Sequence, residues 1–196
     1  YYLLLHFWTG LFGSGDLAVR SLSAAFSLAA VVGLLFLVRR VYGLEAGLVA
    51  AGILLASGFA TYYANEARMY SLVMALVVLL GWSLVLLRER PTIGRAALLW
   101  LAATLLLYTH YWSFFLLGAL LIWLVARSIR PGPSARPGRL GVAAIALSGV
   151  AFLPWYPIFS YQSAHTGTPW AKVPDMQIAL TGILHFYDNQ GELPTA

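Results

Sequence analysis

The sequence predicts an all-α protein, a multi-pass bundle of transmembrane helices. Hydrophobic residues make up 61% of the 196 residues and charged residues only 10%, whereas soluble domains carry roughly 25% charged residues. The mean hydropathy is +0.80, and long apolar runs alternate with short polar turns. Because the basic residues are spread over these turns and form no single patch, we expect no nucleic-acid partner. The absence of cysteine excludes disulfides and thiolate metal sites.

About six spanning helices are expected, after an aromatic N-terminal stretch at 1–16. That stretch is too short to span and should lie in the membrane interface. The first span follows the turn at 13–16, where Ser14 or Asp16 can cap its helix. Pro154 and Pro157 should loosen the end of the last span. The expected spans are 17–38, 46–63, 69–87, 96–108, 111–126 and 140–159.

The segment 96–126 predicts either one helix or two. One helix would be about 46 Å long, against a hydrocarbon core of about 30 Å. Two helices place the loops at 39–45, 88–95 and 127–139 on one side of the membrane. These loops contain nine of the twelve Lys and Arg residues: Arg39, Arg40, Arg88, Arg90, Arg95, Arg127, Arg130, Arg136 and Arg139. The positive-inside rule therefore favours two helices and makes this side cytoplasmic.

Residues 1–159 are thus expected to form one transmembrane module, followed by an extracytoplasmic loop at 160–196. The apolar stretch 176–187 within that loop is too short to span. The chain starts with Tyr and stops at "GELPTA", so we expect an internal fragment of a longer protein, with this loop truncated. The excess of arginine over lysine is typical of a GC-rich bacterium and predicts a location in the bacterial plasma (inner) membrane.

Polar side chains gather at three helix junctions on the side opposite the arginine-bearing loops. The junctions carry Asp16 and Arg20, then "TYYANEARMYSL" at 61–72, then Thr109, His110, Tyr111 and Trp112. Arg20 and Arg68 stand on the side where the positive-inside rule disfavours arginine. This placement indicates an anionic partner, and phosphate suits a guanidinium group because the two form bidentate, charge-assisted hydrogen bonds.

These residues also have structural explanations, which the sequence leaves open. Arg20 can pair with Asp16 four residues earlier, and Glu66 can pair with Arg68 only if their turn is irregular. His110 can be a hydrogen-bonded packing residue. Several aromatic residues can form an interfacial belt: Tyr62, Tyr63, Tyr70, Trp112, Trp155 and Tyr156. The remaining histidines show no pattern and no metal motif: His6, His165 and His185.

The segment "ANEARMYSL" at 64–72 resembles the Gln/Asn-Glu-Ala-Arg-x-Tyr element of the dolichyl-phosphate-mannose–protein mannosyltransferase-like family. That family belongs to the GT-C glycosyltransferase superfamily and includes the aminoarabinose transferases. The segments "YYLLLHFW", "FGSGDLAVRSLSAAFSL", "RRVYGLEAGLVAA" and "LLLYTHYWSFFLL" are similar to other elements of the family. The resemblance covers residues 1–126 and thins from Leu140 onward. Asp16 and Leu22 depart from the family's Glu and Pro.

The resemblance implies a GT-C type fold and an enzyme that moves a sugar from a polyprenyl-phosphate donor to an acceptor hydroxyl on the outer face. Arg20 and Arg68 would hold the lipid phosphate. Asn65 and Glu66 would orient Arg68, accept sugar hydroxyls or help to coordinate a divalent metal ion. The resemblance implies further contacts to the sugar or the prenyl chain from Tyr63, Tyr70 and His110. The carboxylate that acts as general base is expected upstream of Tyr1, so no catalytic residue is assigned within this chain.

The resemblance leaves the sugar and the acceptor open, whereas the donor and the membrane lipids are expected partners. The main alternative function is a polytopic transporter or flippase for a lipid-linked or anionic substrate. A transporter would place charges near the bilayer midplane, whereas here the charges lie at the ends of the expected spans. A scaffold without catalytic activity would not need arginines placed against the topological bias.

Overall fold

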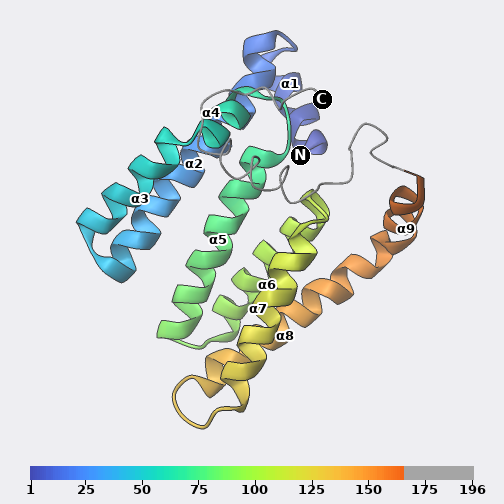
Figure 1. Cartoon of the computed structure of the whole chain (residues 1–196). Helices are drawn as coiled ribbons and strands as arrows, with labels where there is room; N and C mark the ends of the chain where they lie inside the picture. Colours follow the sequence, from blue (N-terminus) through green and yellow to red (C-terminus); the bar gives the residue numbers. More distant parts are fainter. Residues whose placement is uncertain (166–196) are drawn as a thin grey trace, which may run out of the picture.

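The computed structural model describes residues 1–165, which are almost entirely helical and contain no strand (Figure 1). The all-α prediction is thereby confirmed. The expected apolar stretch 176–187, His185 and most of the expected loop at 160–196 lie outside the described residues. The helices are α1 (Tyr2–Phe12), α2 (Asp16–Tyr42), α3 (Leu44–Ala56), α4 (Gly58–Asn65), α5 (Tyr70–Glu89), α6 (Ile93–Thr109), α7 (Ser113–Ile129), α8 (Ala135–Phe152), the 3₁₀ turn η1 (Leu153–Trp155) and α9 (Tyr156–His165).

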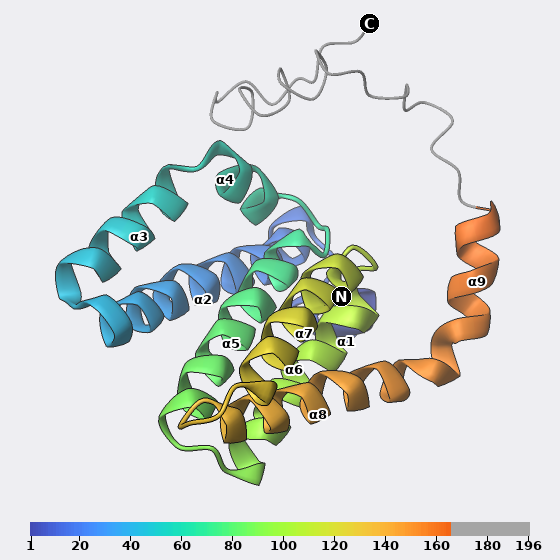
Figure 2. The same ribbon diagram turned by 60° about the horizontal axis from the view of Figure 1, so that its bottom comes forward.

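Helix α5 lies in the middle of the bundle and connects its two halves. It packs against α2, which pairs with α3, and against α6, while α8 packs on both α6 and α7 (Figures 1 and 2). The buried leucines of α5 recur at helical spacing, at Leu72, Leu76, Leu80 and Leu87, and so form one stripe. They join a single core with buried residues of α6, α7 and α8.

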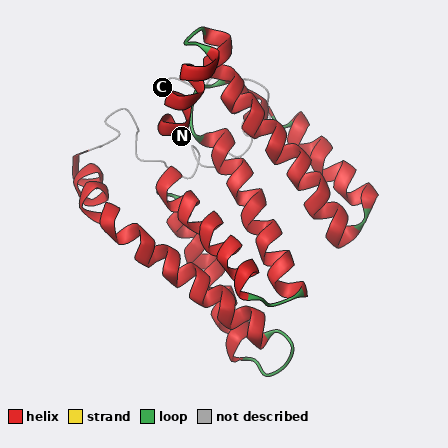
Figure 3. Ribbon diagram, turned by 180° about the vertical axis from the view of Figure 1, so that it is seen from behind, coloured by secondary structure: helices red, strands yellow, loops and turns green. Residues whose placement is uncertain are grey.

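The connections between helices fall at two opposite ends of the bundle (Figures 1 and 3). The α2–α3, α5–α6 and α7–α8 connections lie at one end, which we call the basic end because most arginines lie there. The α1–α2, α4–α5 and α6–α7 connections lie at the other. The break at His110, between α6 and α7, confirms the prediction of two helices in 96–126.

Three helical units among the described residues are long and apolar enough to cross a bilayer. They are α2, α5 and the continuous unit Ala135–His165, and α3 with α4 makes a fourth if counted as one bent span. Helices α6 and α7 have 17 residues each, or about 25 Å at 1.5 Å per residue, which is near the lower limit for a span. The expected count of six spans therefore stays a prediction.

The expected span over 46–63 is not one continuous helix in the structure. Helix α3 stops at Ala56, and α4 starts at Gly58 with a bend of 62° between them. Ser57 adopts an extended conformation, and its side chain accepts a hydrogen bond from the Ala60 N–H. A serine at this position satisfies a free N–H at the start of a new helix, so the break replaces a continuous ladder of backbone hydrogen bonds with a cap.

Two other expected boundaries differ from the structure. Neither Ser14 nor Asp16 caps α2: the N-cap is Gly15, without a side-chain bond, and Asp16 is the first helical residue. Helix α8 starts five residues before the expected Leu140, at Ala135, and contains Pro137 in its first turn. Proline is tolerated there because its missing N–H would have no partner within the helix.

The end of the last span agrees with the predicted effect of its prolines. Pro154 lies in η1, which interrupts the α-helical geometry after Phe152. The helix then resumes as α9 and continues past the expected end at 159 to His165. Proline costs the helix a backbone hydrogen bond, so the tighter turn forms where that bond is missing.

The aromatic N-terminal stretch forms α1, which has 11 residues and no buried one. Two side chains attach it to the start of α2. The Trp8 indole N–H donates to the Ala18 carbonyl oxygen at 3.0 Å, and the Tyr1 hydroxyl lies 2.7 Å from the hydroxyl of buried Ser23. These contacts place α1 at the end of the bundle opposite the basic end, and its interfacial position in a membrane stays a prediction.

Candidate functional site

Arg20 links the start of α2 to the end of α4. Its Nε donates to a carboxylate oxygen of Asp16 at 2.8 Å, and its Nη1 donates to the backbone carbonyl of Asn65 at 3.1 Å. The expected alternative of an Asp16–Arg20 pair is therefore present in the structure. The side chain of Arg20 remains 49% exposed, so the other guanidinium N–H groups can still bind a ligand.

The segment 66–69 between α4 and α5 is an irregular turn. Glu66 is extended, and the Arg68 N–H donates to the Glu66 carbonyl at 2.8 Å. In this turn the Arg68 Nε lies 3.8 Å from a carboxylate oxygen of Glu66, a pairing that regular helical geometry would not allow two residues apart. The separation exceeds that of a hydrogen bond, and the Arg68 side chain is 58% exposed. The guanidinium group is therefore oriented by Glu66 but remains open to a second anion.

Aromatic rings connect this turn to the α6–α7 junction. The Tyr63 and Tyr70 ring centroids lie 4.2 Å apart, and those of Tyr70 and His110 lie 5.6 Å apart. The row begins at Phe59 on the first turn of α4, whose ring centroid is 4.6 Å from that of Tyr63. Three separate chain segments thus contribute to one continuous aromatic surface. We call the whole set the arginine–tyrosine cluster: Asp16, Arg20, Tyr63, Asn65, Glu66, Arg68, Tyr70 and His110.

The surroundings of His110 favour its neutral form. Its Nδ1 accepts the backbone N–H of Trp112 at 3.2 Å, so this nitrogen carries no proton and the Nε2 carries one. Partial burial lowers the pKa of His110 below its ordinary value, because desolvation disfavours the charged imidazolium. The hydrogen-bonded packing role expected as an alternative is present, and the Nε2–H remains a donor that the described protein groups do not use.

Asn65 uses its side-chain amide and its backbone carbonyl for different contacts. Its side-chain amide donates to the Thr61 carbonyl at 2.9 Å and so closes the last turn of α4. Its contact with the cluster is made by its backbone carbonyl, to Arg20. A sequence pattern cannot predict that the backbone carbonyl makes this contact, because every residue type has the same carbonyl group.

Sequence reasoning missed Ser71, which positions Tyr63. Ser71 is fully buried, and its hydroxyl donates to the Tyr63 carbonyl at 2.6 Å. This bond joins the end of α4 to the first turn of α5 across the irregular turn. The sequence could have indicated this role, because a serine at the start of an apolar run is expected to be buried. A buried hydroxyl group needs a hydrogen-bond partner.

The expected aromatic belt divides into separate roles. Trp112, Tyr156 and Tyr62 are strongly exposed, as belt residues would be. The Trp155 indole N–H instead donates to the Tyr111 hydroxyl at 3.1 Å, and that hydroxyl donates to Gln162 at 2.6 Å. These bonds fasten the α6–α7 junction to η1 and α9, and so fix the position of neighbouring His110.

Metal coordination finds no support in residues 1–165, where no three side chains of the His, Asp or Glu type converge as a ligand set. Glu66 is the acidic residue beside Arg68, and Asp16 is engaged by Arg20. A divalent metal ion at this cluster therefore stays a prediction.

Comparison with known proteins supports the resemblance seen in the sequence. The sequence model of the dolichyl-phosphate-mannose-protein mannosyltransferase family matches residues 1–155, from α1 through η1. The match includes every residue of the arginine–tyrosine cluster and extends past Ala126. Searches of curated proteins and of solved structures return no match. This multi-pass helical membrane protein belongs to the dolichyl-phosphate-mannose-protein mannosyltransferase family, a family of membrane glycosyltransferases.

Proposed function

We propose that this protein transfers a sugar from a polyprenyl-phosphate donor to an acceptor hydroxyl on the extracytoplasmic face of a bacterial plasma membrane. The observation that carries the proposal is the pair of half-exposed arginines, Arg20 and Arg68, at the end of the bundle opposite the basic end. Both belong to one cluster, because Arg20 binds the Asn65 carbonyl directly before Glu66. The positive-inside rule supports the orientation, since the basic end would face the cytoplasm.

The chemistry of the transfer explains why fixed cations are needed. The acceptor oxygen forms a bond to the anomeric carbon, and the bond from that carbon to the phosphate oxygen breaks. The electron pair stays on the polyprenyl phosphate, and the acceptor proton passes to a carboxylate base. Negative charge therefore grows on the phosphate, and cations already positioned there stabilise the transition state.

Each member of the cluster has a role in this proposal. Arg68 is aimed by Glu66 at a distance that leaves its N–H groups available to phosphate. Arg20 is anchored by two bonds and offers its remaining N–H groups. Tyr63 and Tyr70, whose rings pack on each other, contact the sugar or the first isoprene units. The neutral His110 donates from Nε2 to a sugar hydroxyl or a phosphate oxygen.

The distribution of charge favours an enzyme over a transporter or flippase. The buried polar groups of residues 1–165 are five serines and the hydroxyl of Thr104, and none of them is ionisable. Two of the serines, Ser83 and Ser148, bond to carbonyls of their own helices. A transport path would need ionisable groups at mid-membrane depth. The charges of the described helices lie instead near helix ends, where a lipid headgroup resides.

The test uses the gene's full translation product in detergent. It measures the binding of polyprenyl phosphate and the turnover of the glycosylated donor. Polyprenyl phosphate should raise the thermal unfolding midpoint, whereas the free sugar should not. Arg68→Gln and Arg20→Gln should each lose most of this shift and lower the release of polyprenyl phosphate from the glycosylated donor by about 10²-fold. Arg130→Gln, which removes a charge at the basic end, is the matched control and should retain both. Translocation of intact donor without cleavage would support a flippase and overturn the proposal.

A further inference from the structure

We propose that a pocket at the basic end binds the headgroup of an anionic phospholipid, a role separate from the proposed sugar transfer and independent of it. A cavity of about 350 Å³ lies where the ends of α5 and α7 meet the start of α8. The arginine–tyrosine cluster lies at the other end of α5, whose 20 residues from Tyr70 to Glu89 span about 30 Å. The pocket is therefore not the donor site.

The lining of the pocket divides into an apolar part and a cationic part. Leu84, Leu87 and Leu124 supply apolar wall, and the last two are almost fully buried. Arg88 and Arg127 supply two guanidinium groups from different helices, at the positions where α5 and α7 approach their ends. A phosphate held between two arginines, with hydrocarbon against the leucines, matches both parts at once.

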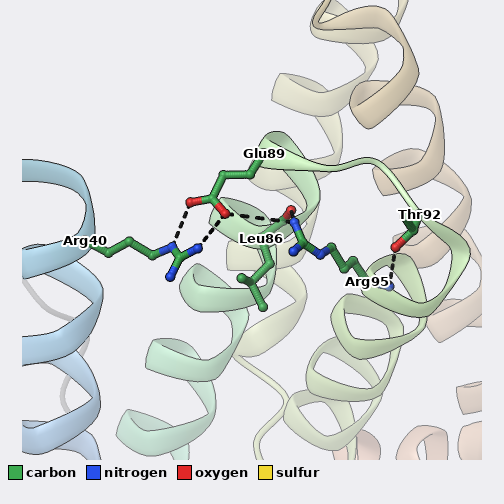
Figure 4. A network of polar contacts seen from close by, with 5 residues as sticks. All are labelled: Arg40, Leu86, Glu89, Thr92 and Arg95. Atoms are coloured by element: carbon green, nitrogen blue, oxygen red, sulfur yellow. Dashed lines mark hydrogen bonds and ion pairs between the residues drawn. The ribbon is translucent and has the colours of Figure 1, made fainter.

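The two pocket arginines lack a carboxylate partner in the described part of the chain. The nearest acid in sequence is Glu89, but both of its oxygens are engaged elsewhere (Figure 4). They accept Nε and Nη2 of Arg40 at 2.7 Å each, and one lies 3.9 Å from Nη1 of Arg95. The positive charge of Arg88 and Arg127 is thus left uncompensated, and an anion from outside the described chain would balance it.

Arg127 is already positioned for this role. Its guanidinium carbon lies 5.7 Å from the centre of the Trp123 ring, within the range of a cation–π contact. The N–H groups at the edge of the guanidinium remain available to phosphate oxygens. Trp123 also lines the pocket and is 51% exposed, and tryptophan is an amphipathic side chain that suits the headgroup level of a bilayer.

The position of the pocket favours a membrane lipid over a soluble phosphate compound. Helices α5 and α7 pack on α6 and α8 and do not form a main packing pair with each other. The pocket lies between their ends, at the boundary of the expected spans. Basic pockets between transmembrane helices at the cytoplasmic boundary bind anionic lipid headgroups. A soluble anion would leave the leucine wall without a partner.

The test titrates the purified protein in nonionic detergent with phosphatidylglycerol or phosphatidylcholine. Phosphatidylglycerol should raise the thermal unfolding midpoint by a few degrees, and phosphatidylcholine should not. Native mass spectrometry should find bound phosphatidylglycerol on the wild-type protein. Arg88→Gln combined with Arg127→Gln should abolish most of the shift and the bound lipid. Arg88→Lys with Arg127→Lys keeps the charge but not the bidentate geometry, and should retain a weaker shift.

The matched control is Arg130→Gln combined with Arg136→Gln, which removes the same charge from the same end of the bundle at residues that do not line the pocket. This control should keep the phosphatidylglycerol shift. Equal losses in both double variants would mean diffuse attraction and overturn the pocket. An equal shift by phosphatidylcholine in the wild-type protein would overturn the requirement for anionic lipid, whether or not the variants fold. An equal shift by inorganic phosphate would overturn the assignment to lipid.

Discussion

The guanidinium group of Arg40 faces the carboxylate of Glu89, 49 positions later, and the two side chains share two parallel hydrogen bonds of 2.7 Å. The pair joins the last turn of α2 to the last turn of α5 at the basic end. Arg95, at the start of α6, lies 3.9 Å from the same carboxylate and donates to the Leu86 carbonyl. One acid thus holds three helix ends together.

Glu89→Gln should lower the thermal unfolding midpoint slightly, because the neutral amide cannot form the bidentate ion pair with Arg40. The effect should be small since both side chains are more than a third exposed, and it should shrink at high salt. Thermal unfolding in detergent at two salt concentrations measures it. Glu45→Gln, an acid of α3 at the same end, should have a smaller effect, and an equal effect would contradict a specific role for Glu89.

Gly47→Ala should destabilise the α2–α3 pair by about 1–3 kcal/mol, the usual cost of overpacking. A Cβ at Gly47 would lie 2.7 Å from the Leu35 carbonyl oxygen, so one of the two helices has to shift. Gly52→Ala, one and a half turns further along α3, has open space around it and should be neutral or slightly stabilising. Thermal unfolding of both variants tests this prediction. Equal destabilisation would show that the contact of Gly47 with α2 is not the cause.

The stability of the protein should fall in mild acid because of His110. Burial lowers the pKa of His110 in the folded state, so the unfolded chain binds a proton that the native imidazole resists. This difference is absent at pH 8 and destabilises the fold progressively as the pH drops below the ordinary histidine pKa of about 6.5. The acid-dependent part of the unfolding midpoint should be smaller in His110→Gln. An unchanged pH profile in that variant would locate the sensitivity elsewhere.

Ser71→Ala should weaken binding of the polyprenyl-phosphate sugar, because it affects the position of Tyr63. The change removes the hydroxyl that hydrogen-bonds to the Tyr63 carbonyl and should cost about 1 kcal/mol of stability. Under the proposed function it should also raise the KM for the polyprenyl-phosphate donor more than it lowers kcat, because Tyr63 loses its fixed position. Ser83→Ala removes a bond to a carbonyl of its own helix and should leave the KM unchanged. If both variants raised the KM alike, a positioning role for Ser71 would be excluded.

Sequence patterns predicted the helices better than the contacts between them. The apolar runs placed the expected spans on helical segments of the structure, although 46–63 covers both α3 and α4 and 140–159 runs from α8 through η1 into α9. The positions of the arginines separated α6 from α7. The break at Ser57 was missed because "LLASGFATYY" is apolar on both sides, and hydropathy does not register a side-chain cap. The expected loop at 127–139 included the first turn of α8, because proline is frequent in loops but also fits the first turn of a helix, where Pro137 lies.

The candidate site shows the same limit at the level of side chains. The sequence singled out Arg20 and Arg68 through their position, since arginine on that side of the membrane goes against topology. It could not show that Arg20 binds a backbone carbonyl of α4, or that Tyr70 lies between Tyr63 and His110. Those relationships depend on how three helix junctions meet, and the spacing of residues along the chain does not encode that.

The break between α3 and α4 ends the helical register of α3 before the tyrosine row begins. In a continuous helix, each added residue turns everything beyond it by 100°, so a change in length would rotate Tyr63 away from Tyr70. At Ser57 the backbone leaves the helical conformation, and α4 is held in place by hydrogen bonds from Arg20 of α2 and Ser71 of α5. The orientation of the tyrosine row therefore depends on α2 and α5 and not on a helical register inherited from α3.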